Sequence, residues 1–219
     1  TDLVSFDLIA FKKEIQSGMY FDSSIPQGYG VGSSGALVAS IYDEYAADKI
    51  TVLENLTRDK LLNLKAVFAL MESFFHGKSS GLDPLNSYLS LPILINSKDS
   101  IEPAGIPSQK EGKGAVFLLD SEQIGETEPM VNIFMNKMKN EGFRKMISEE
   151  FSTTTDACIE DFLQGNVKSL FGNVKSLSKI VLTNFKPMIP DAFHKVWEKG
   201  ISTNDYYLKL CGSGGGGYI

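Results

Sequence analysis

The sequence is poor in the residues that build disulfide frameworks and metal centres. Its 219 residues include two cysteines, Cys158 and Cys211, and two histidines. The cysteines lie far apart and lack the short spacing of zinc ligands, and a disulfide framework normally contains more of them. We therefore interpret both cysteines as free thiols in a reducing compartment.

Long hydrophobic runs are also missing. No stretch of about 18 apolar residues occurs, and the first residues mix polar and apolar side chains. The sequence therefore predicts neither a transmembrane helix nor a signal peptide and no membrane partner. A cytoplasmic location is the default expectation.

Basic residues are fewer than acidic ones, 21 against 27, and the formal net charge is -6. This balance argues against a general affinity for nucleic acid, because phosphate backbones are bound by clustered Lys and Arg. Hydrophobic residues make up 42% and charged residues 22%, as in ordinary globular proteins. The length suits one large domain or two small ones.

The periodicity of apolar residues predicts a chain of helices with a few short strands. In the first half we expect a strand at Met19 to Phe21, a helix from about Ser34 to Asp48 and another from Thr57 to Phe75. The apolar stripe of the last helix is Leu64, Val67, Phe68, Met71, Phe74 and Phe75. Residues 96 to 114 read as a linker or domain boundary. In the second half we expect strands at 115–119 and 206–210, and helices near 130–145, 155–163, 167–182 and 191–199.

The first segment that indicates chemistry is Pro26 to Ala36, PQGYGVGSSGA, between a predicted strand and a predicted helix. Glycines at 28, 30 and 32 let the backbone come close to a ligand, and the helix start offers N-H groups to an anion. These features favour a phosphate cradle. The alternative is a glycine-rich turn with Ser33 or Ser34 as N-cap. The spacing fits neither a Walker loop nor a Rossmann fingerprint.

The second segment is Glu72 to Asp83, ESFFHGKSSGLD. Glu72 lies on the flank of the apolar stripe, where its carboxylate reaches either a central cleft or plain solvent. His76-Gly77 ends the helix, and a turn then carries Asp83. By itself, this aspartate also suits an ordinary turn.

The third segment is Lys209 to Gly217, KLCGSGGGG, a predicted strand end followed by glycines. Backbone amides in such a loop can line bound phosphates. An artificial glycine-serine tag is the alternative, but the preceding strand and Lys209 favour a natural motif.

Taken in order, these segments resemble the three motifs of the GHMP superfamily of small-molecule kinases, and the mevalonate kinases within it most closely. PQGYGVGSSGA is similar to Pro-x-x-x-Gly-Leu-Gly-Ser-Ser-Ala, with Val31 for Leu and Gly35 for Ala. HGKSSGLD is similar to His-Gly-x-Pro-Ser-Gly-Val-Asp, with Ser79 for Pro. KLCGSGGGG is similar to Lys-Leu-Thr-Gly-Ala-Gly-Gly-Gly-Gly, with Cys211 for Thr. Asp83 follows Glu72 by eleven positions, the separation in that family.

The resemblance implies an α+β fold with two lobes. Residues 1–109 would form a lobe like ribosomal protein S5 domain 2, and residues 110–219 a ferredoxin-like lobe. It also implies that both ends are truncated, with a basic residue of an N-terminal strand preceding Thr1. Because the Val31 and Gly35 departures are small changes in size, we expect them to leave the backbone cradle intact.

The resemblance further implies ATP and Mg²⁺ as cofactors. Phosphates would be bound by Gly28, Gly30, Gly32, Ser33, Ser34, Gly212, Gly214 and Gly215. Ser34 and Glu72 would hold Mg²⁺, and Asp83 would be the catalytic base. We expect the Ser34 and Glu72 side-chain oxygens within about 6 Å of each other, because Mg²⁺-oxygen bonds are about 2.1 Å. We also expect the Gly28 to Ser34 amides and Asp83 to face an open cleft.

The implied activity is phosphorylation of a small alcohol, mevalonate first. Phosphomevalonate or a sugar is the alternative substrate, because the substrate-reading loops are the least diagnostic. A nucleotide-binding sensor without turnover is an alternative of another class, as is a decarboxylase on the same fold. A homodimer is among the assemblies that the resemblance allows.

Overall fold

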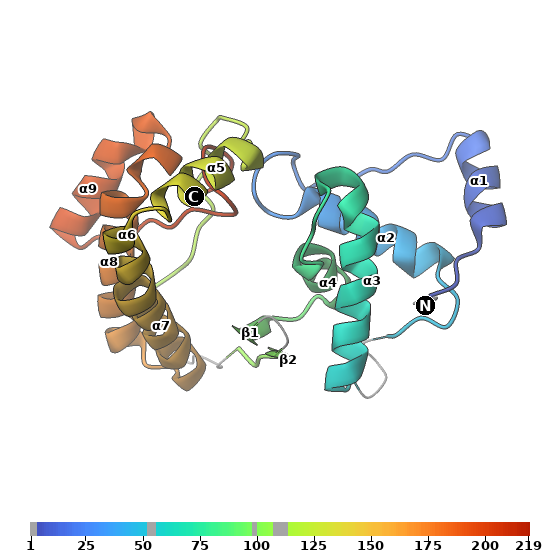
Figure 1. Ribbon diagram of the computed structural model, residues 1–219, viewed down its shortest axis with the longest axis horizontal. Coiled ribbons are helices and arrows are strands. Elements are labelled where there is room, and N and C mark those ends of the chain that lie inside the picture. Colours follow the sequence, from blue (N-terminus) through green and yellow to red (C-terminus); the bar gives the residue numbers. More distant parts are fainter. Residues whose placement is uncertain (1–3, 52–55, 98–99, 107–113) are drawn as a thin grey trace. The chain divides into compact units, whose positions relative to one another are not determined.

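The computed structural model describes residues 4–51, 56–97, 100–106 and 114–219 (Figure 1). In these residues, helices are combined with a small antiparallel sheet, which is an α+β composition. The chain forms two compact units, Thr1–Pro26 with Gly32–Gly105 (unit 1) and Gln27–Val31 with Ile106–Ile219 (unit 2). The elements of unit 1 are α1 Leu8–Gln16, α2 Ser33–Tyr45, α3 Arg58–His76, α4 Leu82–Leu89, β1 Ile93–Ser97 and β2 Ser100–Pro103. Those of unit 2 are α5 Thr127–Lys137, α6 Glu141–Met146, the π-helical turn η1 Ile147–Phe151, α7 Ser152–Gln164, α8 Val167–Asn184, the 3-10 turns η2 Lys186–Met188 and η3 Asp191–Phe193, and α9 His194–Thr203.

The core of unit 1 lies where α2, α3 and α4 pack together (Figure 1). Tyr42 of α2 is at its centre, with ring centroids 5.0 Å from Phe68 and 5.1 Å from Tyr88. Edge-to-face contacts of this kind are favourable beyond the burial of their area. The Tyr42 hydroxyl accepts a hydrogen bond from the Ile50 amide at 3.1 Å, so its polar end is also satisfied.

Both helices predicted in the first half are present, with differences at their ends. Thr57 caps α3 by accepting from the Lys60 amide at 3.3 Å, as its residue type favours. Helix α2 stops at Tyr45 rather than Asp48, because the chain turns there and Ala46 forms a β-bridge with Phe6. The inclusion of Phe74 in the apolar stripe was wrong, since its side chain is 87% exposed.

A β-hairpin occupies part of the segment that the sequence marked as a linker. Strands β1 and β2 are antiparallel, with Ile93 opposite Pro103 and Ile95 opposite Ile101. Ile101 is buried in the unit 1 core, which ties the hairpin to the helices. The lobe boundary expected between residues 109 and 110 lies outside the described residues.

The core of unit 2 is built from residues of α5, α6, α8 and α9, of the helical turns η1 to η3 and of the C-terminal segment. Trp197 of α9 is almost fully buried and donates from its indole Nε1 to the Ser178 carbonyl of α8 at 3.0 Å. Phe185 lies against Phe143, with ring centroids 5.6 Å apart. The helices predicted at 155–163, 167–182 and 191–199 correspond to α7, α8 and α9.

The single helix expected at 130–145 is divided into α5 and α6. Asn140 interrupts it by capping α6, where its side-chain oxygen accepts from the Phe143 amide at 3.0 Å. Asn is among the preferred N-cap residues because its side chain competes with the helical backbone for hydrogen bonds.

The strands predicted at residues 19–21, 115–119 and 206–210 do not form as regular strands. Tyr20 is 83% exposed and Val116 is 98% exposed, so neither apolar run is covered. Instead, Leu119 exchanges backbone hydrogen bonds with Ile219 at 2.7 and 2.9 Å, next to an isolated bridge between Asp120 and Tyr218.

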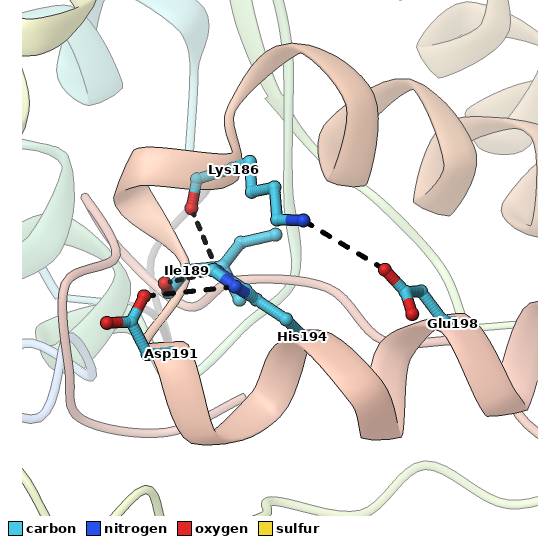
Figure 2. A network of polar contacts seen from close by, with 5 residues as sticks. All are labelled: Lys186, Ile189, Asp191, His194 and Glu198. Carbon is cyan, nitrogen blue, oxygen red and sulfur yellow. Dashed lines mark hydrogen bonds and ion pairs between the residues drawn. The ribbon is translucent and has the colours of Figure 1, made fainter.

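A polar cluster closes the corner where η2 and η3 lead into α9 (Figure 2). His194 Nε2 lies 3.2 Å from the Lys186 carbonyl and 3.0 Å from the Ile189 carbonyl. Carbonyl oxygens only accept, so Nε2 carries the hydrogen. Nδ1 faces Asp191 at 3.8 Å, and Lys186 Nζ reaches Glu198 at 4.0 Å. The histidine therefore holds the two turns onto the start of α9.

Among the described residues, the search for helices long and apolar enough to cross a membrane finds none.

Two helical glycines in unit 2 give opposite predictions for substitution by alanine. In a helix interior, alanine is favoured over glycine by about 1 kcal/mol. Gly172 of α8 has nothing within 4 Å of the position of an added Cβ, so Gly172→Ala is expected to stabilise the protein by about 0.5–1 kcal/mol. At Gly200 of α9 the added Cβ would lie 2.5 Å from the Tyr206 carbonyl oxygen, so Gly200→Ala is expected to destabilise by about 1–3 kcal/mol. Urea unfolding of both variants measures this difference, and equal shifts would contradict the described packing of α9.

Candidate functional site

The start of α2 has the features of an anion site. Its N-cap is Gly32, which adopts a left-handed conformation with φ of 80° and has no side chain to cap the helix. Ser33 and Ser34 form the first turn, where backbone N-H groups have no acceptor within the helix. The partial positive charge of the helix start adds to the attraction for an anion.

Glu72 of α3 reaches this helix start. Its side chain is only 4% exposed, and Oε1 accepts a hydrogen bond from the Ser34 hydroxyl at 3.1 Å. A buried carboxylate is costly unless hydrogen bonds replace the lost water. At 3.1 Å, the Ser34 hydroxyl oxygen and Glu72 Oε1 lie well within the expected separation of about 6 Å. The proposed metal role of this pair stays a prediction.

Ser79 is the residue of this group that sequence reasoning missed. Its hydroxyl donates to Oε2 of Glu72 and accepts from the Gly81 amide at 3.0 Å. The sequence signal was weak, since Ser79 reads as an ordinary turn residue. Only the reversal of the chain at Gly77, which ends α3, brings it back beside Glu72.

Asp83 lies in the first turn of α4 and is exposed. It is next to the start of α2, since a Cβ on Gly32 would lie 3.6 Å from the Asp83 Cβ and 3.9 Å from its Cγ. The structure thus gathers Gly32, Ser34, Glu72 and Asp83, from two of the three motifs, in unit 1.

Two glycines without room for a side chain hold Asp83 in this position. A Cβ on Gly35 would lie 2.7 Å from the Asp83 carbonyl carbon, and one on Gly81 would lie 2.2 Å from the Lys65 carbonyl oxygen of α3. Glycine at position 35, where the motif that the sequence resembles has alanine, therefore differs by more than a small change in size. It sets how closely α2 approaches α4.

The remaining predicted glycines lie in unit 2, where the first and third motifs meet. An added Cβ on Gly30 would lie 2.8 Å from the Cys211 carbonyl oxygen, and one on Gly212 would lie 3.0 Å from the Gly30 Cα. The Tyr218 backbone N-H donates a hydrogen bond to the Tyr29 carbonyl at 3.0 Å, and the Gly125 N-H donates to the Gly28 carbonyl at 2.8 Å. Residues 27–31 are thus packed against the C-terminal glycine loop.

Two backbone amides of the C-terminal glycine loop donate hydrogen bonds to carbonyl groups of the chain. Gly215 donates to the Met188 carbonyl at 2.7 Å, and Gly214 donates weakly to the Cys211 carbonyl at 3.4 Å. A phosphate on either amide would have to replace the present bond. The assignment of Gly214 and Gly215 as phosphate ligands therefore stays a prediction.

Tyr29 and Tyr218 lie side by side at this junction, with ring centroids 5.0 Å apart. Burial raises the pKa of the Tyr29 phenol above its usual value, and the nearby Asp120 carboxylate raises it further. Tyr29 therefore keeps its proton at neutral pH and remains a hydrogen-bond donor.

An open groove of about 530 Å³ runs along α2 and α4 within unit 1. Its lining residues are Ile25, Ala36, Ala39, Ser40, Asp43, Thr51, Ser87 and Tyr88. Ser87 follows Asp83 by four positions, so the groove comes within about one helical turn of that carboxylate.

The donor set around Ser34 suits a hard cation that brings most of its own ligands. The described part of the chain has no group of three or more His, Cys, Asp and Glu side chains placed to hold a metal ion. Glu72 with the serine hydroxyls instead supplies oxygen donors. Mg²⁺ prefers oxygen and commonly takes one or two protein ligands beside phosphates and water.

Comparisons of the chain with protein-family models, with curated proteins and with solved structures return no match.

The contact between α2 and α4 predicts the effect of Gly35→Ala. The added methyl group would push on the backbone of Asp83 and Pro84, which are held from the other side by α3. We expect a loss of about 1–3 kcal/mol in unfolding free energy. Urea unfolding measures it, with Ser40→Ala as a control on the exposed face of α2. Gly35→Ala as stable as that control would contradict the close approach at Asp83.

Proposed function

We propose that this chain is the ATP-binding and catalytic core of a GHMP-type kinase, which transfers the γ-phosphoryl group of ATP to the hydroxyl of a small alcohol. Mevalonate is the first candidate substrate, with phosphomevalonate or a sugar next. The observation that carries the proposal is the hydrogen bond between Ser34 and Glu72 beside Asp83. These three residues come from two separate motifs and meet at one uncapped helix start.

The geometry supports phosphate binding at the start of α2. Gly32 provides no side-chain cap, and the helix dipole at the start of α2 favours an anion. A polyphosphate is an anion and would suit this helix start. Gly32 itself has a φ of 80°, a conformation that residues with a side chain rarely adopt, so glycine is favoured at this helix start.

Ser34 and Glu72 would hold the Mg²⁺ that accompanies ATP, and that ion would supply charge neutralisation at the β- and γ-phosphates. The Ser34 hydroxyl donates a hydrogen bond to Glu72, and its oxygen would act as the ligand. Glu72 keeps this hydroxyl oriented, so the pair is organised before a ligand arrives.

Asp83 would orient the alcohol and accept its proton. The alcohol oxygen forms a bond to the γ-phosphorus while the bond to the β-phosphate oxygen breaks, giving a phosphate monoester, ADP and a proton. The proton passes to the Asp83 carboxylate. Exposure of Asp83 and the nearby groove along α4 support access of a small substrate.

The finer fold belongs to the same proposal. We expect a lobe like ribosomal protein S5 domain 2 followed by a ferredoxin-like lobe. A cytoplasmic location and a homodimer are part of the expectation. The described residues contribute an α+β composition and the division into two compact units.

The decisive experiment measures nucleotide binding and turnover in the full chain. ATP binding with and without Mg²⁺ is titrated calorimetrically, and ADP release is then followed with mevalonate, phosphomevalonate, galactose and homoserine. Mg²⁺-dependent ATP binding with turnover of one alcohol is expected. Failure to bind ATP would overturn the proposal. Binding without turnover of any alcohol would favour a sensor.

Glu72→Gln tests the metal assignment. The amide keeps the size of the side chain and one acceptor oxygen but removes its charge, so the fold should persist while the affinity for Mg²⁺ falls. We expect the Mg²⁺ concentration for half-maximal ATP binding to rise about tenfold or more. An unchanged Mg²⁺ dependence of ATP binding would contradict the assignment of Glu72 as a metal ligand and leave it a structural role.

Asp83→Asn tests the base. Asparagine keeps the size of aspartate but cannot take the proton, so kcat should fall by at least about 10². ATP affinity should barely change, because the phosphates are bound by other groups. Steady-state kinetics and ATP titration separate the two effects, and near-normal kcat would remove Asp83 from the mechanism.

A further inference from the structure

Ser79 occupies a position that connects two parts of the candidate site. Its hydroxyl donates to Glu72 Oε2 on α3 and accepts from the Gly81 amide at 3.0 Å. Gly81 is the N-cap of α4, the helix whose first turn carries Asp83. One side chain therefore links the carboxylate of α3 to the start of α4.

Ser79 also completes the hydrogen bonding of Glu72. Ser34 donates to one carboxylate oxygen and Ser79 to the other, so a nearly fully buried carboxylate has a donor on each side. With both oxygens held, the carboxylate plane cannot turn freely about its last bond. Loss of either donor leaves a buried acceptor unsatisfied.

From this double contact we infer that Ser79 is a positioning residue of the phosphoryl-transfer site, which fixes Glu72 toward Ser34 and fixes the turn that presents Asp83. This inference rests on the proposed function. A hydroxyl is needed here because one group has to donate and accept at once. Proline, which stands at this position in the family pattern, can do neither with its side chain.

The neighbouring serine provides a matched control. Ser80 lies in the same turn, is exposed, and accepts only a long hydrogen bond from the Leu82 amide at 3.3 Å. Ser80→Ala therefore removes a hydroxyl from the turn without changing a contact to Glu72. Ser79→Thr keeps the hydroxyl and serves as the conservative variant.

The test compares Ser79→Ala, Ser80→Ala and Ser79→Thr by ATP titration at increasing Mg²⁺. Residues that orient a metal ligand typically change metal affinity or activity 10- to 100-fold. We expect Ser79→Ala to raise the half-maximal Mg²⁺ concentration about tenfold, with Ser80→Ala unchanged and Ser79→Thr close to the unaltered protein. A merely structural role would lower the urea midpoint without this shift.

A double-mutant cycle with Glu72→Gln locates the effect. If Ser79 acts through the carboxylate, Ser79→Ala should add no further shift in Mg²⁺ dependence once Glu72 is replaced. Additive shifts, or Ser79→Ala behaving as Ser80→Ala does, would overturn the role of Ser79 alone. Absence of Mg²⁺-ATP binding by the unaltered protein would overturn the proposed function and the positioning role together.

Discussion

The burial of the Glu72 carboxylate is the constraint on which the candidate site depends. A charged group that is 4% exposed is tolerated only if its oxygens find donors, and two serine hydroxyls provide them. One donor comes from the start of α2 and the other from the turn after α3. Satisfying this one carboxylate therefore requires three segments of the chain to be in place at once.

Several glycines are required because neighbouring segments pack so closely that no side chain would fit between them. Gly35 and Gly81 allow α4 to approach α2 and α3 more closely than any side chain would permit. In unit 2, a Cβ on Gly217 would lie 2.5 Å from the Tyr29 carbonyl oxygen, so glycine joins the two loops there as well. Among the glycines that suggested phosphate contact, Gly30 and Gly212 are likewise in close contact with each other's loop.

Helices α2, α3, α7, α8 and α9 were predicted to within a few residues, whereas α1, α4 and the division between α5 and α6 were missed and the predicted strands do not form. Helix α3 follows from its own cap and its own three- and four-residue apolar spacing, which are local features. A strand needs a partner, and the sequence of 115–119 does not say where its partner lies. The candidate site shows the same division. The motifs predicted that the Ser34 and Glu72 side chains lie close together, which their hydrogen bond confirms, while their roles stay predictions. Ser79 gained its contact only through the fold of the turn at Gly77.

The charges at the start of α2 limit how an anion can bind there. Glu72 and Asp83 both place a carboxylate near this helix start, and the candidate residues themselves contribute no cationic side chain. A helix start offers only about half an elementary charge, which is less than the two carboxylates carry. Under the proposed function, the Mg²⁺ that accompanies ATP would offset the repulsion between these carboxylates and the bound phosphates.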